Sequence, residues 1–167
     1  IKGTNKRIVF PEGEDKRVLG ACVRLKKDGL VTPIILGNVE EIKKTAKELN
    51  VCIDDIEIID PTKAEDFDEL VEKFVERRKG KNTKEEAETF LKDVNYYGTM
   101  MVQVGKADGM VSGAVHSTGD TVRPALQIVK TKCFKNKWSN GYAWKKWRKI
   151  CICRYCYQYH FRSKRIS

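Results

Sequence analysis

Residues 7–37 read RIVFPEGEDKRVLGACVRLKKDGLVTPIILG and decide the fold, because two short apolar runs flank one helical pattern. The first run, residues 8–10, ends at a proline and a glycine, and Asp15 follows in a position to cap a helix over residues 16–28. The second run, residues 32–37, shows no alternation of apolar and polar residues, which is typical of a strand buried on both faces. A strand, a helix and a strand in this order predict two parallel strands joined by a crossover helix.

The same alternation continues along the chain. Asn38 stands where it can cap a second helix, and residues 56–60 form a third apolar strand. Further helices are predicted at residues 65–79, 83–92 and 94–105 and from residue 118, and a further strand at residues 109–112. Pro124 is expected in the first turn of the last helix. We therefore expect an α/β protein with a layered parallel sheet and flanking helices.

The composition changes abruptly after Lys132. The chain carries 33 Lys and Arg against 23 Asp and Glu, a net charge of +10. Residues 133–167 contain ten of the basic residues and no acidic one, so residues 1–132 hold 23 of each sign and are neutral. All three tryptophans and four of the six cysteines also follow Lys132. The excess positive charge therefore belongs to residues 133–167 and does not indicate what residues 1–132 bind.

The basic segment has two functional interpretations. Lysines and arginines interleaved with tryptophans and tyrosines favour nucleic-acid binding, because they supply charge and stacking. Three cysteines and a histidine favour zinc, although a single CxxC without a second spaced pair is a weak signal. These four residues are Cys151, Cys153, Cys156 and His160. The other two cysteines, Cys22 and Cys52, lie within apolar patterns and are expected to be buried in a reduced compartment.

Several kinds of protein are disfavoured by missing patterns. Residues 1–132 contain neither of the GxGxxG and GxxxxGK[ST] nucleotide fingerprints, and they lack HExxH or paired Cys/His spacing. No apolar run approaches the roughly 20 residues that span a bilayer, and the sequence begins without a signal-peptide pattern. We therefore expect a cytoplasmic protein with no bound metal and no membrane partner.

The segment best suited to ligand binding is residues 108–127, DGMVSGAVHSTGDTVRPALQ. It ends a predicted strand and opens a helix, which is where open α/β sheets bind ligands. Its glycines permit close backbone approach, and the hydroxyls of Ser117 and Thr118 with the free amides of the helix start favour an anion. Arg123 could hold a phosphate through two hydrogen bonds. The alternative is a plain connection whose small residues serve packing.

Three other features allow a functional and a structural interpretation. Arg78, in VERRKGKNTKEEA, could bind a nucleotide phosphate or be a solvated cation at a helix end. His116 stands alone and is expected to form hydrogen bonds or pack rather than act as a base. The acidic group Glu12, Glu14 and Asp15 is explained by charge and capping at a helix start.

Four motifs, in order along the chain, resemble the phosphate acetyl/butyryl transferase family. They are RIVFPEGED followed by RVL, TPIILGN, ERRKGK followed by EEA, and DGMVSGAVHSTGDTVRPALQIVKT. The last motif is specific to the family and the others support it, and the match runs from about Lys6 to Thr131. The resemblance implies two α/β domains of the isocitrate/isopropylmalate dehydrogenase type, with the active site in the cleft between them and a homodimer as the usual assembly.

The resemblance implies phosphate acetyltransferase activity, acetyl-CoA + phosphate = acetyl phosphate + CoA, with coenzyme A as a substrate and without cofactor or metal. Phosphate butyryltransferase or a related acyltransferase is the alternative. Arg78 and Arg123 would bind substrate, with Ser117 and Thr118 beside them. The catalytic residues are expected in the C-terminal half of the family's fold, which no position here matches. Residues 1–132 would thus be the N-terminal part of the transferase domain, an incomplete fold that is inactive alone.

The resemblance also gives a third interpretation of residues 133–167. After QIVKT the family continues with a segment rich in Gly and Val and then with a motif of the type ADxAIN. Codons chosen for the tail and read from the second base of the Cys133 codon give ASKTNGVMVMLG and later ADTAIN, without a stop. We therefore expect a shift of reading frame after about Lys132 and a non-homologous, poorly ordered tail. Nucleic-acid binding is then not expected.

Overall fold

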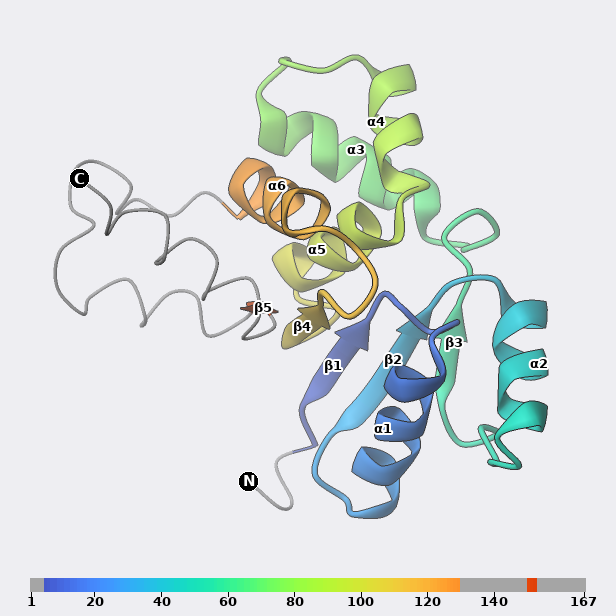
Figure 1. The fold of residues 1–167 in the computed structure, drawn as a ribbon. Coiled ribbons are helices and arrows are strands. Elements are labelled where there is room, and N and C mark those ends of the chain that lie inside the picture. Colours follow the sequence, from blue (N-terminus) through green and yellow to red (C-terminus); the bar gives the residue numbers. More distant parts are fainter. Residues whose placement is uncertain (1–4, 130–149, 153–167) are drawn as a thin grey trace, which may run out of the picture.

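The computed structural model describes residues 5–129 and 150–152 (Figure 1). The strands are β1 (Arg7–Phe10), β2 (Thr32–Leu36), β3 (Glu57–Ile59), β4 (Gly109–Ser112) and β5 (Ile150–Ile152). The helices are α1 (Lys16–Lys27), α2 (Val39–Glu48), α3 (Phe67–Arg78), α4 (Lys84–Leu91), α5 (Val94–Val104) and α6 (Thr118–Ile128). Every element predicted between residues 7 and 128 is present close to its predicted bounds.

The five described strands form one parallel sheet in the order β3-β2-β1-β4-β5. The chain builds the sheet outward from β1 to β3 and then returns to place β4 on the other side of β1. This reversal of strand order is a topological switch point, and it sets the carboxyl ends of β1 and β4 side by side. The α/β class with a parallel sheet and flanking helices is confirmed.

The sheet separates two apolar cores, because neighbouring residues of a strand point to opposite faces. Val9 and Ile34 pack in the core that includes residues of α3, α4, α5 and α6. Phe10 and Ile35 pack in the core that includes residues of α1 and α2. Figure 1 shows the two groups of helices on either side of the sheet. Asp15 caps α1 as predicted, accepting hydrogen bonds from two backbone N–H groups of its first turn.

Helix α5 lies close against the sheet because Gly98 has no side chain. A Cβ at this position would lie 2.9 Å from Met110 Sδ, 3.1 Å from Val9 Cγ1 and 3.2 Å from Leu36 Cδ1. We expect Gly98→Ala to lower the free energy of unfolding by about 1–3 kcal/mol, since over-packing a filled core typically costs that much. Urea unfolding of the variant measures the effect.

Gly20 provides the matched control for this prediction. It lies within α1, and no heavy atom comes within 4 Å of the Cβ that alanine would add. Gly20→Ala should therefore raise the free energy of unfolding by roughly 0.5–1 kcal/mol, because alanine favours a helix interior. If Gly98→Ala stabilised the chain as Gly20→Ala does, the close packing of α5 on the sheet would be contradicted.

Two expectations drawn from the sequence are wrong. Cys52 is exposed, because it lies in the turn region beyond α2, where its thiol donates to Asp54 Oδ2 at 3.2 Å. Cys22 is buried as predicted, and burial raises the pKa of its thiol to about 12. Pro124 lies inside α6 rather than in its first turn, since Ser117 caps the helix and Thr118 begins it.

Three residues of the predicted tail belong to the sheet. Ile150–Ile152 form β5 and pair with the outer side of β4. The rest of residues 133–167 lies outside the described residues. The zinc and nucleic-acid interpretations rest on these residues and are therefore untested. The predicted domain boundary after Lys132 and the predicted poor order of the tail stay predictions. Within residues 5–129 and 150–152, no group of three His, Cys, Asp or Glu could hold a metal ion. No helix in this part is long and apolar enough to cross a membrane.

Candidate functional site

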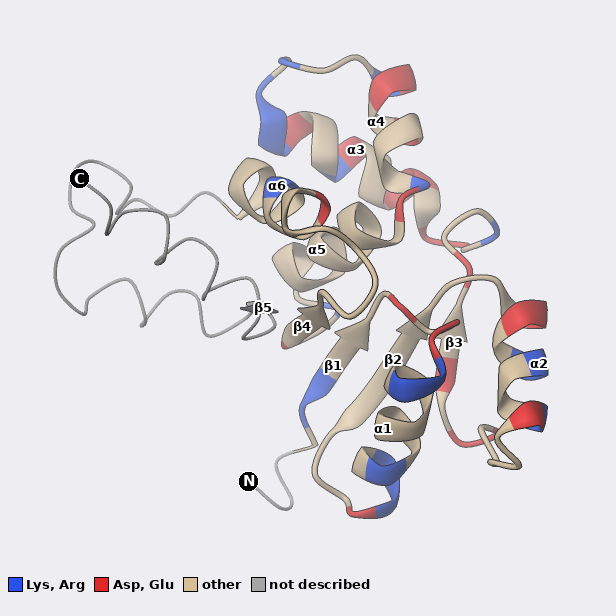
Figure 2. Cartoon of the chain, in the orientation of Figure 1, with Lys and Arg blue, Asp and Glu red and all other residues tan. Residues whose placement is uncertain are grey.

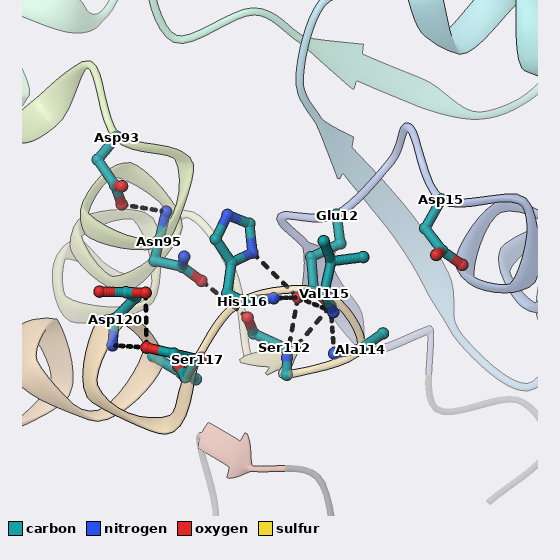
Figure 3. Close-up of polar contacts among 12 residues, drawn as sticks. Glu12, Asp15, Asp93, Asn95, Ser112, Ala114, Val115, His116, Ser117 and Asp120 are labelled. Carbon is teal, nitrogen blue, oxygen red and sulfur yellow. Dashed lines mark hydrogen bonds and ion pairs between the residues drawn. The ribbon is translucent and has the colours of Figure 1, made fainter.

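The switch point of the sheet brings together the two loops that follow β1 and β4. Residues Ile8 and Val9 of β1 stand opposite Gly109 and Met110 of β4 in the parallel register. Glu12, just after β1, therefore lies beside the loop that follows β4, although about 100 residues separate them in sequence. Figure 3 shows the Glu12 side chain surrounded by this loop. In open α/β folds this is the edge at which ligands bind.

Glu12 is a buried carboxylate enclosed by hydrogen-bond donors, its side chain being 3% exposed. Its Oε1 accepts from the backbone N–H groups of Val115 at 2.9 Å and His116 at 2.8 Å. Its Oε2 accepts from those of Ala114 at 2.8 Å and Gly113 at 3.1 Å. His116 Nδ1 lies 3.0 Å from Oε1. Burial would raise the pKa of Glu12, but the N–H groups of His116, Val115 and Ala114 outweigh it, so the pKa is lowered.

This arrangement adds one feature and corrects one interpretation of the sequence. The backbone amides of residues 113–116, in the loop before α6, are occupied by Glu12, whereas the expectation of an anion at the α6 start itself stays a prediction. Glu12 is not merely a charge at a helix start, since Asp15 is the residue that caps α1. His116 forms a hydrogen bond, in agreement with the structural role expected for it.

Ser117 and Thr118 lie at the exposed N-terminus of α6. Ser117 Oγ accepts from the Asp120 N–H at 3.3 Å and donates to Asp120 Oδ2 at 2.6 Å, and this hydroxyl lowers the pKa of Asp120. The Ser117 carbonyl also accepts from Thr121 Oγ1 at 3.1 Å. The structure thus brings the two predicted residues together at a helix start, with the Ser117 hydroxyl engaged in capping.

Arg78 and Arg123 come from different helices and act on the same tyrosine. Tyr96, on α5, is 7% exposed, and its hydroxyl donates to Gln127 Oε1 at 3.1 Å. Burial raises the pKa of this hydroxyl, whereas the charges of Arg123 and Arg78 lower it. The packing around Tyr96 agrees with this. Gln127 lies one turn after Arg123 on α6, and the ring of Phe74, one turn before Arg78 on α3, lies 6.3 Å from the ring of Tyr96. The helix turns that carry the two arginines predicted to bind substrate therefore both adjoin the contacts of Tyr96.

The end of α3 that carries Arg78 is held in place by hydrogen bonds. Arg78 Nε donates to Asn82 Oδ1 at 2.8 Å, and Asn82 Nδ2 donates to Glu86 Oε2 at 3.0 Å. The preceding Arg77 donates to the last carbonyl groups of α6 at 2.8 and 3.0 Å, which ties α3 to α6. Figure 2 shows basic residues at the end of α3 and on α6. This bonding orients Arg78 without neutralising it, since its partner is an uncharged amide.

A buried polar pair joins the end of β4 to the start of α5. Ser112 Oγ donates to Asn95 Oδ1 at 2.7 Å, and both residues are buried. Asp93 caps α5 by accepting from the backbone N–H groups of Asn95 at 2.8 Å and Tyr96 at 3.1 Å. Asn95 Nδ2 is buried without a hydrogen-bond partner among the described residues. The pair fixes α5, and therefore Tyr96, relative to the loop that begins after Ser112.

Reasoning from the sequence missed Glu12, Asn95 and Tyr96. For Asn95 and Tyr96 a signal was available, because two polar groups stand at the start of the apolar run VNYYGTMM and buried polar groups need partners. Glu12 gave no comparable signal. Its role depends on the pairing of β1 with β4, which no local pattern specifies.

Fold and site together define an α/β protein whose predicted substrate-binding residues follow the point where a parallel sheet reverses its strand order. Residues 1–140 match the model of the family described as Phosphate acetyl/butaryl transferase, and the chain belongs to this family. The resemblance inferred from the motifs is confirmed.

Curated relatives and solved structures agree with this assignment. The chain is 58% identical over 132 residues to phosphate acetyltransferase of Staphylococcus aureus (strain MRSA252) and 60% identical to that of Staphylococcus epidermidis (strain ATCC 12228 / FDA PCI 1200). These matches cover 79% of this chain and 40% of each relative. The chain thus spans about 40% of the length of the curated relatives it matches.

Among solved structures, the chain is similar to the EutD phosphotransacetylase from Staphylococcus aureus, with a TM-score of 0.76 and 56% identity. It is also similar to a phosphotransacetylase from Streptococcus pyogenes, with a TM-score of 0.78 and 55% identity. These comparisons cover 81% and 82% of this chain and 41% and 42% of the two structures. The observed fold is therefore the corresponding part of the phosphotransacetylase fold.

Proposed function

We propose that this chain supplies a substrate-binding part of a phosphate acetyltransferase active site, for the reaction acetyl-CoA + phosphate = acetyl phosphate + CoA. The observation that carries the proposal is that the helices bearing Arg78 and Arg123 both contact Tyr96, through Phe74 and Gln127, close to the start of α5 that is bonded to the end of β4. Guanidinium groups bind phosphate oxygens through paired, charge-assisted hydrogen bonds. Both substrates and both products of the reaction carry phosphate, so two arginines near one another suit this chemistry.

Acetyl transfer also requires groups that phosphate binding does not supply. The thiol of CoA must lose its proton, because the thiolate is the nucleophile. The carbonyl oxygen gains negative charge in the tetrahedral state and needs donors directed at it. Glu12 and Asp120, the carboxylates nearest the α6 N-terminus, are both engaged in hydrogen bonds that lower their pKa. We therefore assign catalysis to parts of the family's fold outside the matched stretch.

The test of this assignment is an assay of acetyl-CoA formation from acetyl phosphate and CoA by the purified 167-residue chain. We expect no turnover, because the proposed site supplies arginines for phosphate, while Glu12 and Asp120 are held by hydrogen bonds and the base for the thiol is assigned outside the described residues. Turnover near the typical enzyme value of about 10 per second would contradict the assignment of catalysis to other parts of the fold. Competition between acetyl and butyryl phosphate, measured on the intact gene product, separates the two acyl donors.

We also propose a cell compartment and an oligomeric state for this protein. A cytoplasmic homodimer is what the family resemblance implies, and the free thiol of Cys22 in the core suits a reducing compartment. Sedimentation of the chain with and without CoA tests the dimer.

The change in composition after Lys132 leads to a prediction at the level of the gene. We expect the DNA across codons 130–136 to contain a single-base insertion or deletion relative to phosphate acetyltransferase genes, with an open alternative frame that encodes ADTAIN. The reason is that all three tryptophans and ten basic residues without an acidic one follow Lys132, and a shifted frame restores a family-like sequence. DNA sequencing measures it directly, and the absence of any open alternative frame downstream would refute the hypothesis.

A further inference from the structure

Glu12 makes a contact that the proposed reaction does not use directly. Its two oxygens take four backbone N–H groups and one ring nitrogen, all from residues 113–116. Consecutive N–H groups converging on one point form an anion-binding concavity of the kind called a nest. Here the anion is a side chain of the same molecule. The nest is therefore filled by Glu12 and is not the place where a substrate phosphate binds.

The loop over Glu12 has few other anchors. Val115 is 65% exposed, and Ala114 is also exposed, so the loop buries little apolar surface. Gly113 has a φ of 108°, a backbone conformation that side chains rarely adopt. Outside the nest, the Arg17 guanidinium donates to the Ala114 carbonyl at 3.2 Å. The conformation of residues 113–116 therefore depends mainly on the Glu12 carboxylate.

This loop leads without a break into the substrate-binding helix. His116 is followed directly by Ser117, which caps α6, and Arg123 lies on the same helix. At its other end the loop begins at Ser112, whose hydroxyl is bonded to Asn95. The loop thus has one fixed end on the sheet, and its other end sets where the first turn of α6 begins.

We propose that Glu12 is a positioning residue, a carboxylate latch that holds residues 113–116 and thereby sets the N-terminus of α6 for a phosphorylated ligand. The latch itself rests on the geometry of the loop, and its consequence for the ligand rests on the proposed function. The negative charge of the Glu12 carboxylate is essential for holding the loop. A neutral glutamine amide at residue 12 would turn an NH₂ group toward the backbone donors and would lose two acceptor sites. Burial makes the loss large, since donors left unpaired inside the protein are costly.

The experiment compares Glu12→Gln, Glu12→Ala and the control Glu14→Gln by amide hydrogen exchange in NMR spectra. Glu14 is an exposed neighbour whose side chain, among the described residues, accepts from the Asn38 backbone N–H at 3.3 Å. We expect exchange at residues 113–116 to be at least tenfold faster in both Glu12 variants and unchanged in Glu14→Gln, with β1 and β2 still protected. Added acetate or formate should slow exchange in Glu12→Ala by occupying the emptied nest, which a merely structural role would not predict.

A second variant covers the case in which Glu12→Gln does not fold. Glu12→Asp keeps the charge and shortens the side chain by one methylene, so exchange of residues 113–116 should fall between the wild type and Glu12→Ala. Wild-type exchange in Glu12→Asp and Glu12→Ala, or no effect of acetate and formate, would overturn the latch. CoA titrated into Glu12→Gln should bind at least tenfold more weakly. If the wild-type chain does not bind CoA, the proposed function fails, while the exchange data still decide the latch.

Discussion

Arg123→Ala is expected to weaken the binding of CoA by roughly 10- to 150-fold, because charge-assisted hydrogen bonds contribute about 1.5–3 kcal/mol each. Arg123 is exposed on α6, one turn before Gln127, which accepts from the Tyr96 hydroxyl, and on the helix that Ser117 caps. Its removal takes away one of the two guanidinium groups proposed to bind phosphate. Isothermal titration of CoA into the wild type and the variant measures the loss.

Two further variants separate the shape of the guanidinium from its charge. Arg123→Lys keeps the charge but loses the planar fork, so an intermediate affinity is expected. Arg24→Ala removes an exposed arginine from the last turn of α1, on the other face of the sheet, and should bind CoA as the wild type does. Equal weakening by Arg24→Ala and Arg123→Ala would show a general effect of net charge and no site at α6.

Tyr97→Ala is expected to lower the free energy of unfolding by about 3–5 kcal/mol, the cost of removing a large aromatic side chain from a core. Tyr97 is fully buried on α5, and its hydroxyl donates to Asp66 at the N-terminus of α3. The adjacent residue on α5 is Tyr96, so the loss of packing also disturbs the contacts of Tyr96 with α3 and α6. Urea denaturation followed by circular dichroism measures the change.

Tyr97→Phe serves as the matched variant, because it keeps the ring and removes only the hydroxyl. Asp66 retains a second partner, Lys106 Nζ at 2.8 Å, so the loss should be about 1 kcal/mol. A loss in Tyr97→Phe as large as in Tyr97→Ala would mean that the hydrogen bond, and not the packing, holds α5 in place.

The helices and strands of residues 7–128 could be predicted because each carries its own local signal. Asp15 and Asn38 stand before apolar helical patterns, and both cap helices in the structure. The unbroken apolar run at residues 32–37 indicated burial on both faces, and β2 contributes to both cores. Each of these patterns involves residues close together in the sequence, so the structure that it predicts does not depend on which distant segments pack against it.

The site could be predicted only in part. Ser117, Thr118 and Arg123 lie within one motif, and their proximity follows from a single helix start. Arg78 was linked to them through resemblance to a family, and its position near Tyr96 depends on the packing of α3 against α5 and α6. The role of Glu12 depends on β1 and β4 being neighbours, a pairing over about 100 residues that no local pattern encodes. Cys52 shows the opposite error, since an apolar neighbourhood in sequence did not place it in the core.

We propose that Arg78 and Arg123 together bind the phosphate groups of CoA. The most direct measurement is isothermal titration of CoA into the 167-residue chain and into the double variant Arg78→Ala/Arg123→Ala, with circular dichroism to establish that both are folded. We predict saturable binding to the wild type that weakens as salt is raised and is lost in the double variant. A folded wild-type chain that does not bind CoA, or equal binding by the folded double variant, would contradict the claim.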